Sequence, residues 1–307
     1  MTGIICLSLQ TMQPSPVPST CVLCLGNFDG VHIAHRELMH TAAKLRKNRF
    51  PDAVCGVFCF DPPTSDFLQD TPAHLCTREE KLERFRETGM EYAFLADFPT
   101  LRNYSPEQFV EEILKKECRC VAAVCGFNHR FGHRGLGNAA LLQSLLGGPV
   151  EVQNEILENE ETVSSSRIRQ LLWEGDAEAA AQLLSQPYTL RAKVIHGKAL
   201  GRKWGFPTIN QVFPKNALIP KHGVYVTDCT LPDGSTCRGV SNVGNRPTVD
   251  HDDAVNCETH LINFDGSLYE EEVTVSFLHY LRSEKKFKST EELRRQIDTD
   301  KQAASEY

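Results

Sequence analysis

Apolar residues follow two kinds of pattern along the chain, and the change between them comes near residue 185. Before that point, short apolar runs alternate with stretches that have the apolar spacing of one helix face. The runs predict strands and the spaced stretches predict helices. The predicted strands are residues 21–26, 53–60, 92–96, 121–125 and 149–157, and the predicted helices are residues 32–47, 77–88, 138–146, 166–173 and 177–184, with another opening at Ser105.

Strands that alternate with helices of this length indicate a parallel sheet covered by helices on both faces. Two of the predicted helices open with a capping box, formed by Thr77 with Glu80 and by Ser105 with Gln108, in which each side chain bonds the backbone of the other. The first part of the chain is therefore predicted to be a Rossmann-like α/β domain.

After residue 185 the pattern becomes one of short β-prone runs separated by Gly, Pro, Asn and Asp, which is typical of an antiparallel barrel or sandwich. These runs are residues 191–195, 222–231, 237–243, 255–263 and 272–281, and a terminal helix is predicted over 290–304. The length of 307 residues is about twice the ~150 residues of a typical domain. We expect two domains, residues 1–186 and 187–307.

Charge and composition narrow the class of protein. Lys and Arg number 33 and Asp and Glu number 40, a net charge of −7, which argues against a protein that coats nucleic acid through bulk charge but allows a local basic pocket. No apolar run approaches the ~20 residues of a membrane-spanning helix, and the first residues lack a basic leader. We expect a soluble cytoplasmic protein, a monomer or weak homo-oligomer, that binds neither membrane nor nucleic acid.

The 12 cysteines fall mostly within apolar runs. Cys21 and Cys24 have the spacing of a metal knuckle, but no second pair follows at zinc-site distance. Residues three apart in a strand also point to opposite faces, so these two thiols would need a turn to hold one ion. The pattern favours buried, reduced thiols that act as small apolar side chains.

A candidate phosphate site follows the first predicted strand, in the segment GNFDGVHIAH at residues 26–35. Its two glycines allow a tight turn into a helix N-terminus, where free N–H groups and the helix dipole favour an anion. His32 and His35 are three apart on one helix face and suit the charge that develops on a transferring phosphate. Taken alone, two such histidines are more often surface residues, so the flanking loop carries the prediction.

This loop resembles the Gly-x-Phe-Asp-Gly-x-His-x-Gly-His signature of the nucleotidyltransferase superfamily, in the version carried by bacterial bifunctional riboflavin kinase/FAD synthetases. Three further segments resemble that family in the same order: LCTREEK at residues 75–81, GFNHRFG at 126–132 and SSSRIR at 164–169. The resemblance implies phosphate stabilisation by His32, His35 and Arg167 and a flavin contact at Asn128. The residues that it implies for ATP binding are Gly26, Asn27, Phe28, Asp29, Gly30, Ser165 and Ser166.

The α/β half also departs from the family pattern. Ala34 replaces the second motif glycine, Asn128 replaces an aspartate and His129 replaces a phenylalanine. The segment DPPT at residues 61–64 stands where the family tends to have Glu-Pro-His-Pro. These changes leave open the alternative of a riboflavin kinase whose adenylyltransferase domain is degenerate.

The segment GRKWGFPTIN at residues 201–210 resembles the riboflavin kinase signature Gly-Arg-x-x-Gly-Phe-Pro-Thr-x-Asn almost position for position. The resemblance implies ATP binding by Gly201, Lys203, Thr208 and Asn210. Thr208 and Asn210 are two apart in an extended segment and so point the same way. Their oxygen atoms suit a hard cation such as Mg²⁺, and a polar strand edge is the alternative interpretation.

Asn256, Glu258 and His260 share one face of a predicted strand, since side chains alternate along a strand. Such a polar row is usually solvent surface, but the resemblance places the family's catalytic glutamate at Glu258, where a carboxylate can deprotonate the ribityl hydroxyl. The segment LRSEKKF at residues 281–287 resembles one that contributes to the flavin pocket. It makes Arg282 a flavin-binding candidate, although this charged run equally fits a solvated helix approach.

The resemblance as a whole implies an enzyme of flavin cofactor synthesis that uses ATP and Mg²⁺. One half would phosphorylate riboflavin to FMN, and the other would transfer AMP to FMN, giving FAD and pyrophosphate. Two alternatives are a kinase that has lost FAD synthesis and a non-catalytic flavin-binding protein. The kinase motif and its glutamate argue against the second alternative.

Overall fold

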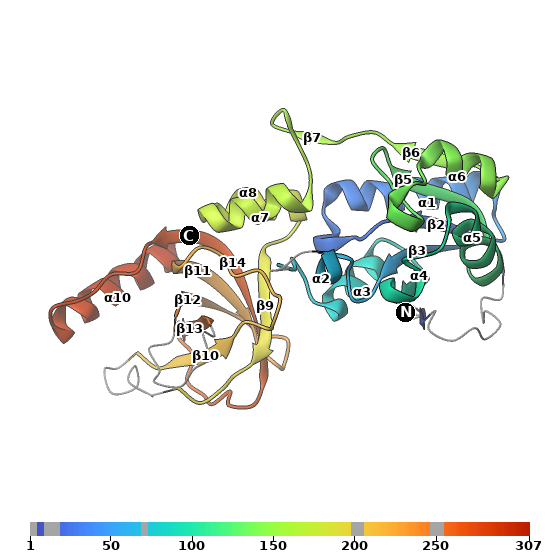
Figure 1. The fold of residues 1–307 in the computed structure, drawn as a ribbon. Helices are drawn as coiled ribbons and strands as arrows, with labels where there is room; N and C mark the ends of the chain where they lie inside the picture. The colour runs from blue at the N-terminus through green and yellow to red at the C-terminus, as the bar shows by residue number, and fades with distance from the viewer. Residues whose placement is uncertain (1–4, 9–18, 69–72, 198–205, 246–254) are drawn as a thin grey trace. The chain divides into compact units, whose positions relative to one another are not determined.

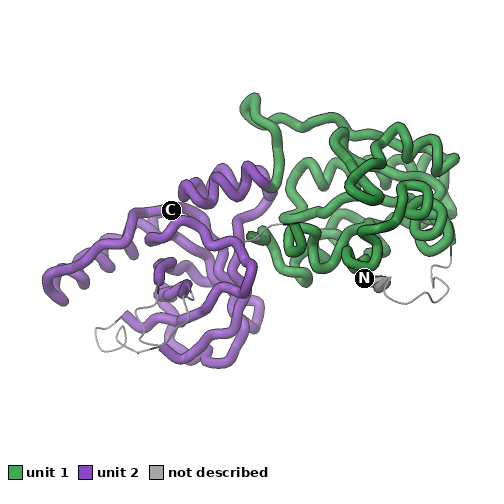
Figure 2. Tube along the Cα trace, viewed as in Figure 1, with its two compact units in different colours: residues 1–165 green, residues 166–307 purple. Residues whose placement is uncertain are grey.

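The computed structural model describes residues 5–8, 19–68, 73–197, 206–245 and 255–307 (Figure 1). The chain divides into two compact units, residues 1–165 and 166–307 (Figure 2), which are described separately. The second unit begins before the predicted domain boundary at residues 186/187, because helix α8 (Ala177–Leu184) packs with its strands and Leu172 O of helix α7 (Ser165–Glu174) accepts from Lys221 N at 2.9 Å. The domain boundary itself stays a prediction.

The first unit is built on a parallel sheet with the strand order β1-β4-β3-β2-β5-β6, which confirms the predicted α/β class. Its strands are β1 (Ile5–Ser8), β2 (Cys21–Leu25), β3 (Val54–Phe60), β4 (Tyr92–Ala96), β5 (Cys120–Gly126) and β6 (Val150–Gln153). Strand β1 has only four residues, too few for a periodic pattern, and was not predicted.

Helices connect these strands, and both predicted capping boxes are present. Thr77 Oγ1 accepts from Glu80 N at 3.2 Å, and Ser105 Oγ accepts from Gln108 N at 3.2 Å. The helices are η1 (Asp29–Val31), α1 (Ile33–Arg49), α2 (Ser65–Leu68), α3 (Arg78–Glu87), α4 (Phe98–Leu101), α5 (Pro106–Gln108), the π-helix η2 (Phe109–Glu117), η3 (His133–Gly135) and α6 (Ala139–Leu146).

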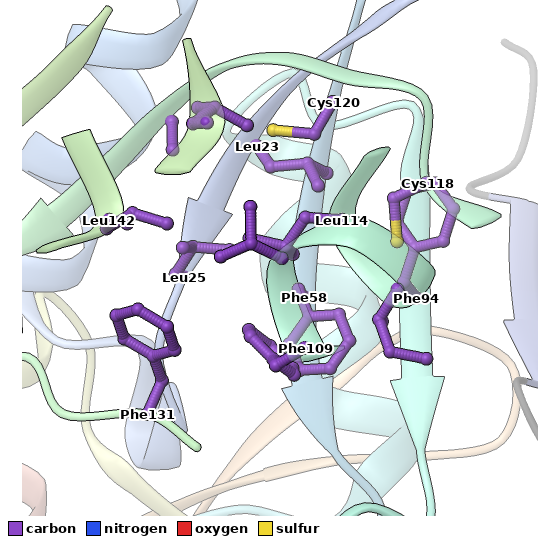
Figure 3. Close-up of a cluster of buried hydrophobic side chains, with 14 of the residues drawn as sticks. Leu23, Leu25, Phe58, Phe94, Phe109, Leu114, Cys118, Cys120, Phe131 and Leu142 are labelled. Carbon is purple, nitrogen blue, oxygen red and sulfur yellow. The ribbon is translucent and has the colours of Figure 1, made fainter. Parts of the chain in front are cut away.

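Each face of the parallel sheet has its own apolar core, because successive side chains of a strand point to opposite faces. In β2, Leu23 and Leu25 join the cluster with η2 and α6 that is drawn in Figure 3, whereas Val22 and Cys24 join the cluster with α1 and α3. All but one of the eleven cysteines with described side chains are buried. The predicted burial of the thiols is therefore confirmed for all of these residues except Cys237, which is half-buried.

The predicted strand over residues 149–157 is wrong as a single element. Strand β6 ends at Gln153, and a separate hairpin follows, formed by β7 (Leu157–Glu158) and β8 (Glu161–Thr162). Its two turn residues, Asn159 and Glu160, have φ of 53° and 65°, and two positive φ angles in a row make a tight two-residue turn.

The second unit is an antiparallel sheet with the strand order β10-β13-β12-β11-β14-β9, followed by a terminal helix. This half-barrel confirms the predicted β class of the second domain. Its elements are β9 (Tyr188–Lys193), β10 (Thr208–Val212), β11 (Gly223–Thr230), β12 (Thr236–Asn245), β13 (Val255–Leu261), β14 (Glu272–Arg282) and α10 (Thr290–Glu306).

The two border strands of this sheet, β9 and β10, approach one another. Just beyond β9, Ile195 N donates to Asn210 O at 2.8 Å. The buried Gln211 of β10 donates from Nε2 to the carbonyl oxygens of Ala192 and Val273, at 2.7 and 2.8 Å. The sheet is thus curled towards closure by one backbone bridge and one side chain. Within the described ranges, no helix is both long enough and apolar enough to cross a membrane.

Candidate active sites

The strand order of the first unit reverses beside β2, because β3 lies on one side of it and β5 on the other. In open parallel sheets, ligands bind outside the carboxyl ends of the strands at such a reversal. The loop that starts at Gly26 leaves β2 at this point, and the loop that carries Asn128 leaves β5 beside it. The topology therefore brings two of the predicted motifs to the same end of the sheet.

Phe28 anchors the first of these loops in the core. Its side chain is fully buried and meets Phe85 of α3 edge to face, with ring centroids 5.5 Å apart. A Cβ atom at Gly26 would lie 3.2 Å from the Phe28 ring, and Gly30 has φ of 78°, an angle that glycine adopts without strain. The two glycines therefore let the backbone turn tightly around the buried ring.

Helix α3 places two buried cations against the same loop. Arg84 donates from Nη1 to the carbonyl oxygen of Gly30 at 2.9 Å, and Lys81 donates from Nζ to that of Asn27 at 3.3 Å. Burial lowers the pKa of Lys81, but acidic neighbours outweigh burial and raise it above its ordinary value, so Lys81 stays charged. These neighbours are Cys59, Cys76, Asp29 and Asp61.

Neither Lys81 nor Arg84 was predicted from the sequence to belong to the site. Both cations are almost fully buried, and buried charges are rare unless they are paired or functional. A positive charge of this kind favours phosphate at the loop. The sequence did contain a sign of their role, because Lys81 and Arg84 are three residues apart on the helix that opens with the Thr77 capping box.

Asp29 and Asn27 hold the loop to its surroundings. Asp29 Oδ1 accepts from Leu75 N at 3.0 Å, and the Asp29 carbonyl oxygen accepts from Ser165 Oγ at 3.0 Å. The exposed Asn27 donates from Nδ2 to Thr64 Oγ1 at 3.1 Å. The structure thus joins Ser165 to the loop after β2, whereas Ser166 and Arg167 continue helix α7 in the second unit. The phosphate-binding roles of these three residues stay predictions.

His32 and His35 lie together at the start of α1, with their rings stacked at a centroid distance of 3.6 Å. His32 is 4% exposed, and the ring of His35 also meets Phe28 at 5.2 Å. Burial, followed by the neighbouring His32 and Lys81, lowers the pKa of His35 well below its usual range. At neutral pH His35 is therefore a neutral imidazole, which has one ring N–H to donate to a phosphate oxygen.

His129 lies in the loop after β5, next to the exposed Asn128. Its backbone N–H donates to Gly126 O at 3.0 Å, and its ring stacks on Phe131 at a centroid distance of 5.9 Å. Burial lowers the pKa of His129 to about 4. This histidine replaces an aromatic residue of the family motif and packs as an aromatic ring.

We expect the substitution His129→Phe to make the first unit more resistant to acid. The His129 pKa is about 4 in the folded chain and 6.5 in its ordinary state, so between these values the unfolded chain binds a proton that the folded chain does not. Stability is therefore lost as pH falls from about 6.5 towards 4. Phenylalanine keeps the ring contact and removes the proton. The melting temperatures of the variant and of the original chain should move further apart as pH falls across this range. A difference between them that does not change with pH would contradict the prediction.

In the second unit, strand register places the predicted kinase residues on one face. Asn210 of β10 lies opposite Glu258 of β13, and Thr208 lies opposite His260, so all four side chains project to the same side. Asn256 Nδ2 donates to Asn210 Oδ1 at 3.0 Å and to Glu258 Oε1 at 3.3 Å. Glu258 is exposed and Asn210 is 7% exposed.

His260 borders this face and is held by the segment that enters β10. Its Nδ1 lies 2.9 Å from the carbonyl oxygen of Pro207, to which it donates. Burial lowers the pKa of His260; the bond to Pro207 raises it, and the charge of Lys301 on α10 lowers it again, for a net decrease. His260 is therefore an uncharged neighbour of Glu258 at neutral pH.

Arg282 joins strand β14 to the terminal helix. Its guanidinium donates to the buried carboxylate of Asp300 from Nε at 3.1 Å and from Nη2 at 2.7 Å, and it lies 6.0 Å from the ring centroid of Phe287. The predicted flavin contact of Arg282 stays a prediction. Gly201 and Lys203 lie outside the described residues.

Gly197 packs against the amide of Asn210, and we expect Gly197→Ala to impair the predicted kinase reaction. The added Cβ would lie 2.6 Å from Asn210 Nδ2, and Asn210 is too buried to move aside freely. A displacement of about 1 Å at a reacting centre can cost on the order of 10²-fold in rate. Initial rates of FMN formation check this, with FAD formation from supplied FMN as the internal reference. An unchanged kinase rate would show that the amide position is unimportant.

Comparison with known proteins decides the family. The model of the FAD synthetase family matches residues 15–167, and that of the riboflavin kinase family matches residues 184–307. The bifunctional riboflavin kinase/FMN adenylyltransferase of Bacillus subtilis is 32% identical over 294 residues, covering 93% of this chain and 92% of that protein. The chain belongs to the bifunctional riboflavin kinase/FMN adenylyltransferase family.

A second curated relative agrees with this assignment, and a solved structure has the same fold. The family member from Escherichia coli K12 is 33% identical over 294 residues, covering 94% of this chain and 92% of that protein. A crystal structure described as a macrolide-efflux protein from Streptococcus pneumoniae is 27% identical, with a TM-score of 0.90 over 99% of this chain and 100% of that one. The predicted pairing of a kinase domain with an FAD synthetase domain is therefore confirmed.

Proposed function

We propose that this chain makes FMN and FAD in two steps at two separate sites. The barrel transfers the terminal phosphoryl group of ATP to riboflavin, and the α/β unit transfers AMP from a second ATP to FMN, with release of pyrophosphate. The observation that supports the residue assignment best is the placement of Glu258 directly opposite Asn210. This pairing brings a proton acceptor and a predicted phosphate ligand to one face of one sheet.

In the kinase step, Glu258 takes the proton of the ribityl hydroxyl while the hydroxyl oxygen attacks the γ-phosphorus. The bond from phosphorus to the bridging oxygen breaks, and ADP leaves. General-base help of this kind contributes about 10²- to 10⁴-fold, and the remainder of phosphoryl transfer depends on positioning and charge neutralisation. Thr208 and Asn210, with Gly201 and Lys203 from the motif, bind the phosphates of ATP.

The donor set at this face fits Mg²⁺ that arrives with ATP. Thr208 offers a hydroxyl oxygen and Asn210 an amide oxygen, and hard cations prefer oxygen ligands. No group of three or more His, Cys, Asp or Glu side chains that could hold a metal occurs in the described part of the chain. Because these two ligands are neutral, the phosphates of ATP would balance the charge of the ion. The bound ion would in turn neutralise negative charge on the transferring phosphoryl group.

In the adenylyl step, the loop after β2 receives the phosphates of ATP. His32 and His35 donate to the transferring phosphate, and the cations Lys81 and Arg84 beneath the loop favour its negative charge. Asn128 contacts the flavin. The remaining residues proposed for phosphate binding or stabilisation are Gly26, Asn27, Phe28, Asp29, Gly30, Ser165, Ser166 and Arg167.

We further propose that the enzyme works in the cytoplasm as a monomer or weak homo-oligomer and does not bind nucleic acid. The net charge of −7 supports the last point, because nucleic-acid binding depends on neutralising phosphate charge with Lys and Arg.

Chromatography of the reaction flavins tests the proposed function. The purified chain is incubated with riboflavin, ATP and Mg²⁺, and the flavins are then separated. We expect FMN first and FAD afterwards. FMN alone would show that the α/β unit no longer makes FAD, and riboflavin that is bound but unconverted would indicate a flavin-binding protein.

A further inference from the structure

Asn256 lies beside two residues of the proposed kinase site, and the mechanism above gives it no role. It is 3% exposed and occupies β13 two residues before Glu258. Because Asn210 is opposite Glu258, Asn256 is its diagonal neighbour across the strand pair. Diagonal neighbours on one face are close enough for long or polar side chains to meet.

The amide of Asn256 can be oriented in only one way. Its two hydrogen-bond partners, Asn210 Oδ1 at 3.0 Å and Glu258 Oε1 at 3.3 Å, are both acceptors. The nitrogen of Asn256, with two hydrogens to donate, must therefore face both of them. Its own Oδ1 is left buried and, among the described residues, without a hydrogen-bond partner.

Leaving a buried acceptor unbonded is unfavourable, and native structures rarely do so without a reason. Here the oxygen of Asn256 is left unbonded because the nitrogen of the same amide faces Asn210 and Glu258. Asn210 is also confined from its other side, where Gly197 comes so near that a Cβ would lie 2.6 Å from Asn210 Nδ2. Its amide oxygen accepts from Asn256, and Gly197 leaves no room for the amide to shift to the other side. Glu258 is exposed, and the hydrogen bond from Asn256 favours one conformer of its side chain.

We propose that Asn256 is a positioning residue for phosphoryl transfer. Its amide nitrogen holds the carboxylate of the base, Glu258, and the amide of the phosphate ligand, Asn210, in one fixed arrangement. This inference depends on the proposed function of Glu258. The proton acceptor and the phosphate end of the site are joined by one side chain that need not touch riboflavin or ATP.

The test compares two substitutions in the full chain. Asn256→Leu keeps the approximate shape and removes both donors, and Asn256→Asp turns a carboxylate oxygen towards two acceptors. Misplacement of a reacting group by about 1 Å costs on the order of 10²-fold, so we expect kcat for FMN formation to fall by about that factor while KM for riboflavin changes less than about twofold. FAD formation from supplied FMN should be unchanged.

The matched control is Asn263→Asp, which makes the same chemical change at an exposed turn residue just after β13. It should leave both reactions at the rates of the unsubstituted chain. All rates are measured well below the unfolding midpoint of each variant, so that loss of folded barrel does not mimic loss of rate. If one Asn256 variant does not fold, the other is judged by the same criteria.

A second measurement separates positioning from a purely structural role. Glu258→Asp shortens the carboxylate and withdraws it from Asn256, so Asn256→Leu should cost less in this background than in the original chain, because residues that act through one another are not additive. A kcat for Asn256→Leu within about threefold of the original, a change in riboflavin KM alone, or full additivity with Glu258→Asp would each overturn the proposal. If Glu258→Gln retains FMN formation, the assignment of the base fails instead.

Discussion

Glu258→Gln should reduce FMN formation by about 10²- to 10⁴-fold, the usual contribution of a general base. Glutamine has nearly the same shape and keeps an oxygen that can accept from Asn256, but it cannot take the proton of the attacking hydroxyl. The rate of riboflavin phosphorylation with MgATP, followed by separation of the flavins, measures the effect.

Two comparisons make this result specific to the barrel site. The same variant supplied with FMN should make FAD at the original rate, because the loop after β2, where we propose that the adenylyl step occurs, lies in the other unit. Glu271→Gln, an exposed position just before β14, should leave both reactions unchanged. Loss of both activities in the Glu258 variant would contradict two separable sites.

His32→Ala should have the opposite pattern, with FAD formation reduced by about 10²- to 10³-fold, as for the loss of one donor to a developing charge. His32 stacks on His35 at 3.6 Å at the start of α1 and is nearly buried. Alanine removes a donor to the phosphate and the surface against which the second ring packs. FAD formation is measured with FMN and ATP as substrates.

The matched control for this variant is His40→Ala, eight residues further along the chain and within helix α1. The ring of His40 is exposed, and its Nδ1 lies 3.6 Å from Glu37 Oε2. His40 is about two helical turns beyond the end of the loop after β2. FMN formation should be unchanged in both variants. If His32→Ala made FAD at the original rate, the loop after β2 would not be the adenylyl site.

Local patterns predicted the elements that carry the motifs, because those patterns contain their own start and stop signals. The capping box at Thr77 fixed the start of α3, and alternation along β13 placed Asn256, Glu258 and His260 on one face. The strand at residues 149–157 failed because the apolar run there continues through an irregular connection into the β7–β8 hairpin.

Contacts between distant segments were not predictable in the same way. The bond from Arg84 to Gly30 depends on how α3 packs against the loop, and the bond from Asn256 to Asn210 depends on the register of two strands that are far apart in sequence. The pairing of Arg282 with Asp300 likewise needs the terminal helix to lie against the barrel. Arg282, predicted to contact the flavin, therefore also binds Asp300, a partner that the motif could not reveal.

The side-chain closure at Gln211 has a consequence for the barrel in crowded solution. A border strand with free main-chain groups is a template on which another chain can add, and natural sheets protect such borders. Gln211 and the bridge from Ile195 to Asn210 occupy main-chain groups of both border regions. Intermolecular strand addition, the first step of sheet-mediated aggregation, therefore finds fewer open partners on this half-barrel than on a flat sheet of the same strands.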